Sequence, residues 1–199
     1  MTSSPPSISL FICDTVRWLE RAVIGLNLCP FAKGVHVKGQ IHYAVTLTKD
    51  LNEVLEILRS ELSALVATPA EVRDTSLLIL PNCLPDFLDF NDFLERAEAL
   101  LEEIELDGVL QIASFHPQFQ FAGTGADDVT NCTNRSPYPT LHLLREGSID
   151  RAVEVFPEAE TIFERNIEVL QALGMQGWSA LDIGPGASER LTSVSSKAV

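Results

Sequence analysis

Apolar residues recur at helical spacing in three stretches of the first half of the chain. Residues 14–28 carry such a stripe and predict a helix that ends before Pro30, because the residue before a proline is disfavoured in helical geometry. Residues 50–65 predict a second helix, which begins with the capping-box-like sequence Asp50-Leu-Asn-Glu53. Residues 90–104 repeat the pattern and predict a third helix.

Three short segments predict strands beside these helices. Residues 41–47 alternate between apolar and polar side chains, which is typical of a strand with one buried face. Residues 77–80 are continuously apolar, which favours a strand buried on both faces, and residues 109–115 predict a third strand. The order strand, helix, strand, helix, strand is typical of an α/β unit whose crossovers make the three strands parallel.

The second half of the chain predicts fewer regular elements. Residues 140–145 predict a fourth strand, and Ser148 is expected to cap a short helix after it. Pro157 is expected near the start of a last helix that runs to Leu173, where Gly174 ends it. From residue 175 onward the periodicity disappears.

These elements predict an α/β protein with a single domain. We expect a three-layer-like mixed sheet of about four strands with flanking helices, and a helix-rich α+β fold of the ferredoxin-like kind is the alternative. Residues 1–9 are expected to form a flexible N-terminal arm, residues 10–180 the globular domain, and residues 181–199 a flexible C-terminal tail.

Composition agrees with one folded domain of 199 residues, because 46% of them are hydrophobic and 21% are charged. No apolar run approaches the roughly 18 residues that span a bilayer, and the N-terminus lacks the basic and apolar regions of a signal peptide. We therefore expect a cytoplasmic protein with no membrane association. The four cysteines form no Cys-x-x-Cys pair and are expected to be reduced thiols.

The net charge of −14 is concentrated in one region. Residues 51–108 hold three basic and fourteen acidic residues. A protein of this sign repels phosphate backbones, so we expect no nucleic-acid partner. The acidic helical face of this region could instead meet a basic protein partner, and a non-catalytic binding or adaptor protein is one of two functional hypotheses.

A long irregular segment, residues 116–139, separates the third predicted strand from the fourth. Loops of this length inside a compact domain are uncommon and often functional. His116 lies at the carboxyl end of the third strand, where ligands bind in open parallel sheets. The alternative is that Phe115, Phe119 and Phe121 hold the loop on the core and that His116 satisfies a backbone carbonyl.

Three segments resemble a known family. Their sequences are Trp18-Leu-Glu-Arg-Ala-Val-Ile-Gly-Leu-Asn-Leu-Cys-Pro-Phe-Ala32, Ser114-Phe-His-Pro-Gln-Phe-Gln-Phe-Ala-Gly123 and Asn134-Arg-Ser-Pro-Tyr-Pro-Thr-Leu-His-Leu-Leu-Arg-Glu146. Together they resemble the bacterial domain-of-unknown-function family numbered 1415, over roughly residues 10–180. The resemblance implies a single-domain bacterial protein and no particular reaction. It also groups the Cys-Pro-Phe, Phe-His-Pro and Asn-Arg-Ser-Pro segments as parts of one candidate site.

Cys29 is the candidate nucleophile of this site, with His116 as its base. Its position at the C-terminal end of a predicted helix disfavours a thiolate, so activation would have to come from His116, Lys33 or Arg135. A buried structural thiol is the alternative.

Arg135 and Arg145 are the candidate anion-binding residues, because they are the only basic residues between positions 109 and 147. Their planar guanidinium groups suit carboxylate or phosphate, and Asn134 and Ser136 add neutral donors. This set predicts a site for a small anionic metabolite, which would be enzymatic if Cys29 or His116 reacts. In the alternative each arginine pairs with a local acid, namely Asp127, Asp128 or Glu146.

The sequence gives little support for a metal site or a cofactor site. The candidate ligands Cys29, His36, His42, His116 and His142 are scattered, without the spacing of a metal motif. We therefore predict no metal site, and no cofactor follows from the sequence.

Overall fold

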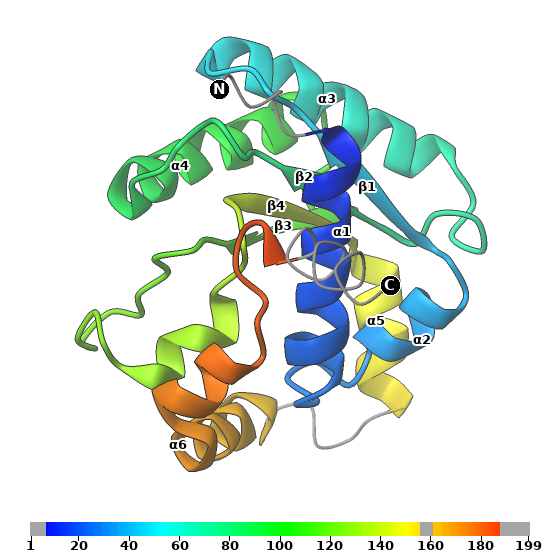
Figure 1. The fold of residues 1–199 in the computed structure, drawn as a ribbon. Coiled ribbons are helices and arrows are strands. Elements are labelled where there is room, and N and C mark those ends of the chain that lie inside the picture. Colours follow the sequence, from blue (N-terminus) through cyan, green and yellow to red (C-terminus); the bar gives the residue numbers. More distant parts are fainter. Residues whose placement is uncertain (1–6, 156–160, 188–199) are drawn as a thin grey trace, which may run out of the picture.

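A four-stranded mixed sheet carries helices on both faces in the computed structural model, which describes residues 7–155 and 161–187 (Figure 1). The sheet order is β1-β2-β4-β3. The strands are β1 (Ile41–Val45), β2 (Thr75–Ile79), β3 (Leu110–Phe115) and β4 (Thr140–Arg145). The predicted α/β class with a four-stranded mixed sheet and flanking helices in a single domain is therefore confirmed.

The predicted parallel arrangement of the first three strands needs one correction. β1 and β2 pair in parallel, but β4 lies between β2 and β3 and runs antiparallel to both. β3 thus points in the same direction as β2 without touching it. The fourth strand along the chain is therefore inserted between the second and third strands of the predicted unit.

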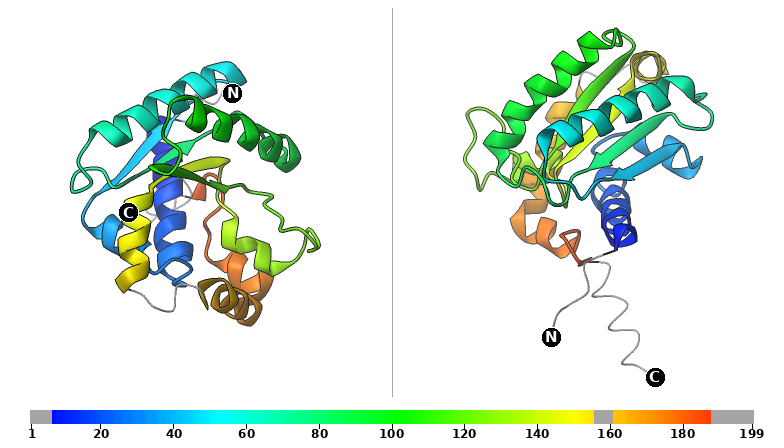
Figure 2. Two further views of the ribbon diagram at one scale, coloured as in Figure 1. Left: turned by 180° about the vertical axis from the view of Figure 1, so that it is seen from behind. Right: turned by 90° about the horizontal axis from the view of Figure 1, so that it is seen from above.

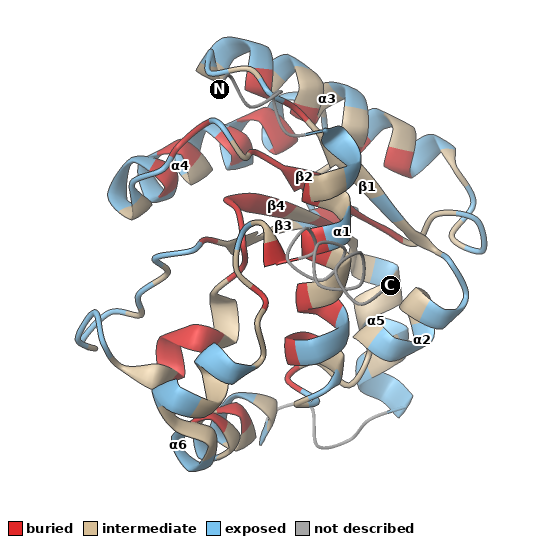
Figure 3. Ribbon diagram, in the orientation of Figure 1, coloured by how far each residue is buried: buried red, intermediate tan, exposed pale blue. Residues whose placement is uncertain are grey.

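Two long helices, α3 (Leu51–Ala67) and α4 (Phe87–Glu103), cover one face of the sheet (Figure 2). Asp50 caps α3 by accepting hydrogen bonds from the backbone of Asn52 and Glu53. The stripes of the two helices pack on the leucines of β2 and β4. Figure 3 shows buried positions on both helices and on these strands. The fully buried residues of this core cluster include Val54, Leu58, Leu62, Leu65, Phe90, Ala97, Leu78, Leu141 and Leu143.

The opposite face is covered by α1 (Ile8–Trp18), a π-helical segment (Leu19–Ile24) and α5 (Glu146–Val155). α2 (Ala32–Val37) follows the π-helix, and the 3₁₀ helix Val129–Asn134 packs against α6 (Ile162–Ala180). The helix predicted over residues 14–28 therefore starts earlier and changes type at Leu19. Its earlier start is explained by apolar Ile8 and Phe11, the second of which is buried.

Other element boundaries also differ from the sequence prediction. α5 begins at Glu146, so Ser148 lies in its first turn, where its Oγ donates to Asp74 instead of capping the helix. The predicted start at Pro157 lies outside the described residues. Gly174 has a φ of 66° that interrupts α6 where the sequence predicted its end, but helical structure continues to Ala180.

The segment 181–187 packs against α1 in the structure, although the sequence predicted a flexible tail from residue 181. Arg17 donates to Asp182, and the buried carboxylate of Asp14 accepts from the backbone of Gly186. Ile183 is buried beside the apolar residues of the π-helix. Residues 181–187 are therefore packed on the domain. At the other end α1 begins inside the predicted arm.

Replacing Ile183 by Ala should lower the free energy of unfolding by about 2–4 kcal/mol, because a side chain only 7% exposed is truncated. Val155→Ala is the matched control, since Val155 is 84% exposed and surface changes of this kind stay within about 0.5 kcal/mol. Urea denaturation measures both. Equal effects of the two substitutions would show that residues 181–187 add nothing to the core.

Candidate functional site

A cavity of about 340 Å³ lies on the face of the sheet opposite α3 and α4. Its walls come from the end of α1, the π-helix, α2 and α5, and its floor from the strands. Most lining residues are apolar: Trp18, Leu19, Val23, Phe31, Ala32, Val35, Ile41, Leu77, Ala113, Phe115, Leu144, Ile149 and Ala152. The polar ones are Cys29, Asp74, Thr75, Gln111, His142, Arg145 and Ser148.

The π-helix shapes one wall of this cavity through Leu19 and Val23. A π-helical turn is wider than an α-helical turn and occurs often at functional sites. The segment ends in a turn in which the backbone of Leu28 donates to the carbonyl of Val23. Cys29 follows directly and reaches the cavity from this turn.

Aromatic rings form a second wall. Trp18 and Phe115 meet edge to face with their ring centroids 5.1 Å apart. The ring of His142 lies 5.9 Å from that of Phe115 at an angle of 36°. The three rings come from α1, β3 and β4, so the wall joins elements that are distant in sequence.

His142 is held by a hydrogen bond from the middle of the sheet. Its Nε2 lies 2.8 Å from Oγ1 of Thr75, and the same oxygen lies 2.6 Å from the carbonyl of Leu143. Burial lowers the pKa of His142 to about 4. The imidazole is therefore neutral at pH 7.

Cys29 is half-buried in the cavity and is a neutral thiol. Burial raises its pKa, and the backbone N–H groups of Phe31 and Ala32, which would stabilise a thiolate, offset this only in part. Since His142 is neutral as well, the cavity holds a thiol and an imidazole without the charge that activates a cysteine nucleophile.

His116, the predicted partner of Cys29, lies on the other face of the sheet. It is fully buried against the rings of Phe87 and Phe90. Its Nε2 contacts the carbonyl of Leu84 at 3.1 Å, and its Nδ1 accepts from the backbone of Gln118 at 3.0 Å. Cys29 and His116 are thus not brought together, and His116 makes the backbone contact that the sequence left as the alternative.

Arg135 holds the long loop of residues 116–139 through hydrogen bonds to its backbone. Its Nε donates to the carbonyl of Phe119 and its Nη2 to that of Ala126. Asn134 donates to the carbonyl of Ser114, and Ser136 to that of Tyr138. The partners of these side chains are backbone carbonyls. Arg135 and Ser136 also line a more open cleft of about 370 Å³ beside residues 178–179 and 182–185.

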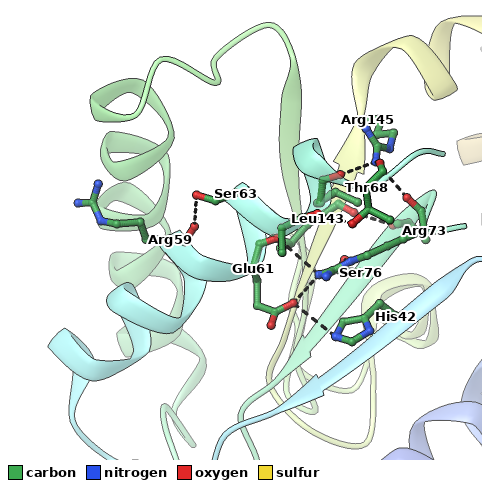
Figure 4. Close-up of polar contacts among 12 residues, drawn as sticks. His42, Arg59, Glu61, Ser63, Thr68, Arg73, Ser76, Leu143 and Arg145 are labelled. Atoms are coloured by element: carbon green, nitrogen blue, oxygen red, sulfur yellow. Dashed lines mark hydrogen bonds and ion pairs between the residues drawn. The ribbon is translucent and has the colours of Figure 1, made fainter.

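Arg145 closes the C-terminal end of α3 (Figure 4). Its Nη2 donates to the carbonyls of Leu65, Thr68 and Arg73. A cation at this place satisfies carbonyls that the helix leaves without partners. Close to Arg145, Arg73 forms an ion pair with Glu61 of α3. A carboxylate oxygen of Glu61 also lies 3.6 Å from Nε2 of His42. Arg145 borders the cavity and directs its Nη2 to the backbone, whereas its Nε is buried without a partner among the described residues.

The remaining predicted residues lie at the surface. Lys33 is exposed on α2 and is not among the residues that line the cavity. Exposed acidic residues follow the outer side of α4, including Asp89, Asp92 and Glu95. A basic protein partner for this acidic face stays a prediction.

Two negative findings concern only the described residues. Among residues 7–155 and 161–187, no group of three or more His, Cys, Asp or Glu side chains is arranged to hold a metal ion. Within the same residues, every helix is too short or too polar to cross a bilayer.

Asn131 is a key residue that the sequence analysis did not single out. Its buried side chain accepts from the backbone of Phe121 and the hydroxyl of Thr124, and it donates to the carbonyl of Gly125. It thereby fixes the tip of the loop to the 3₁₀ helix. A buried asparagine of this kind has no sequence signature beyond lying in a loop rich in turn residues.

Asn131→Ala should lower the free energy of unfolding by about 2–4 kcal/mol, because it leaves buried polar groups of the loop without partners. Asn134→Ala is the matched control, since Asn134 makes one side-chain hydrogen bond, of 3.3 Å. Its cost should be nearer 1 kcal/mol. Chemical denaturation of both variants measures the difference, and similar costs would contradict the role given to Asn131.

The stability should fall as the pH drops from 6.5 to 4. The pKa of His142 is lowered to about 4 in the folded state, from about 6.5 in the unfolded chain. Above pH 6.5 this histidine is neutral in both states, and its contribution to stability is complete. Between pH 6.5 and 4 only the unfolded chain gains the proton, so the free energy of unfolding falls. At about 1.4 kcal/mol per pKa unit, the loss reaches roughly 3 kcal/mol.

Unfolding free energies of wild type and His142→Gln measured from pH 7 to 4 check this. The variant should lose less stability than wild type over the range. Identical pH curves for wild type and His142→Gln would refute the assignment.

Comparison with known proteins adds a family but no established activity. No curated protein matches the chain, and no solved structure matches it either. Residues 11–180 match the family described as "Protein of unknown function (DUF1415)". This range contains the four strands of the sheet and the polar residues that line the cavity. The chain therefore belongs to the DUF1415 family.

Proposed function

We propose that this protein binds a small, uncharged and largely apolar molecule in the cavity beside Trp18, Phe115 and His142, without catalysing its reaction. The observation that carries the proposal is the lining of the cavity, in which aliphatic and aromatic side chains predominate and a few polar groups converge. Pockets of this composition, from about 300 Å³ upward, are typical of small-molecule sites.

The charges around the cavity favour an uncharged ligand over the anionic metabolite expected from the sequence. Among the described residues, Arg145 is the one basic side chain that lines it apart from neutral His142, and its Nη2 donates to three backbone carbonyls. Asp74 adds a carboxylate on the same side. An anion would therefore meet the like charge of Asp74 and an arginine whose Nη2 already contacts the backbone.

The protonation states favour binding over catalysis. A cysteine nucleophile needs a thiolate, and burial raises the pKa of Cys29 in this cavity. An imidazole with a pKa of about 4 is also a weak base at neutral pH. Cys29 and His142 thus contribute shape and hydrogen bonding to the site.

A thermal-shift panel of toluene, indole and sodium benzoate tests the proposal. Toluene or indole should raise the melting temperature of the wild type, since a ligand at ten times its Kd adds about 1.4 kcal/mol to the stability of the folded state. Benzoate at the same concentration should leave it unchanged.

The variant Ala113→Leu should abolish the shift by filling the floor of the cavity. Ala99→Leu is its control, because Ala99 is exposed on α4, far from the site. The proposal fails if neither uncharged probe raises the melting temperature, or if Ala113→Leu responds as wild type does.

A further inference from the structure

The hydrogen bonds of Thr75 define the tautomer of His142. The hydroxyl of Thr75 has one proton, and the carbonyl of Leu143, 2.6 Å away, can only accept it. The oxygen of Thr75 must then accept from Nε2 of His142 at 2.8 Å. In the neutral ring the proton lies on Nε2, and Nδ1 carries a lone pair.

Nδ1 of His142 faces accessible space. It has no hydrogen-bond partner among residues 7–155 and 161–187. It is also absent from the buried side-chain atoms without a partner in that part of the chain, which are Tyr43 Oη, Arg145 Nε and Asn166 Oδ1. Since His142 lines the cavity, the open side of its ring is the side that a bound molecule would meet.

Two neighbouring hydroxyls of the cavity are engaged with the protein. The hydroxyl of Thr75 is used twice, as described above. Ser148 donates to Asp74 at 2.6 Å and accepts from Arg151 at 2.9 Å. Gln111 is exposed to solvent at the edge. Nδ1 of His142 is therefore an acceptor that lies beside the aromatic wall and has no partner among the described residues.

From this arrangement we infer that the ligand is an aromatic ring bearing a hydroxyl or N–H group, which donates to Nδ1 of His142 while the ring packs on Trp18 and Phe115. Such a ligand satisfies Nδ1 of His142 and matches the rings that line the wall. The inference rests on the proposed function and adds the chemical class of its ligand.

Binding of 4-propylphenol and 4-propyltoluene to the full-length wild type, measured by calorimetry, tests the inference. The two probes differ by a hydroxyl in place of a methyl group of similar size. The phenol should bind about tenfold more tightly, because an unpaired buried acceptor costs about as much as a hydrogen bond contributes.

Two variants locate the contact. His142→Phe should remove the preference for the phenol while 4-propyltoluene still binds. Asp74→Asn is the matched control and should keep the preference, since its carboxylate already accepts from Ser148. A preference that survives in His142→Phe and disappears in Asp74→Asn would overturn the assignment.

The affinities of the two probes for the wild type test the inference even if His142→Phe does not fold. Equal affinity for the two probes overturns the inference and leaves the proposed function intact, because both still occupy the cavity. Failure of both probes to bind overturns the inference and counts against the proposed function as well.

Discussion

The pairing of β4 with two neighbours is the constraint on which the rest of the structure depends. β2 and β3 run in the same direction, and β4 supplies hydrogen bonds to both from between them. Side chains alternate across this strand, so Leu141 and Leu143 enter the core under α3 and α4 while His142 faces the cavity. A slip of one residue would put the imidazole among the leucines and expose the leucines to the cavity.

Local elements were predictable because local residues determine them. The apolar stripes and capping aspartate of α3, and the apolar run of β2, follow from neighbours within one or two turns. The place of β4 in the sheet could not be predicted in this way. It depends on where the chain returns to the sheet after the loop of residues 116–139. The residues near β4 in sequence carry no signal for that position. The π-helix likewise leaves no mark in the apolar spacing, which continues through Leu19 and Val23.

The candidate site was harder to predict for a different physical reason. Arg135, Arg145 and His116 were selected by residue type, as groups suited to anions or acid–base chemistry. Their partners are backbone carbonyls, which every residue has and which no sequence motif reports. Cys29 was predicted directly at the end of a helix. In the structure the helical segment ends at Ile24, and Cys29 follows the next turn and lines a cavity with His142 in place of His116.

The central position of β4 also bears on how the chain folds during synthesis. α3 and α4 can pack on β1 and β2 as soon as these segments leave the ribosome, but the inner edges of β2 and β3 stay open until residues 140–145 follow. Open strand edges between apolar faces are templates for pairing with other chains. A nascent or prematurely ended chain that stops within the long loop is therefore the species most exposed to aggregation, and completion of the sheet is a late, non-local step in folding.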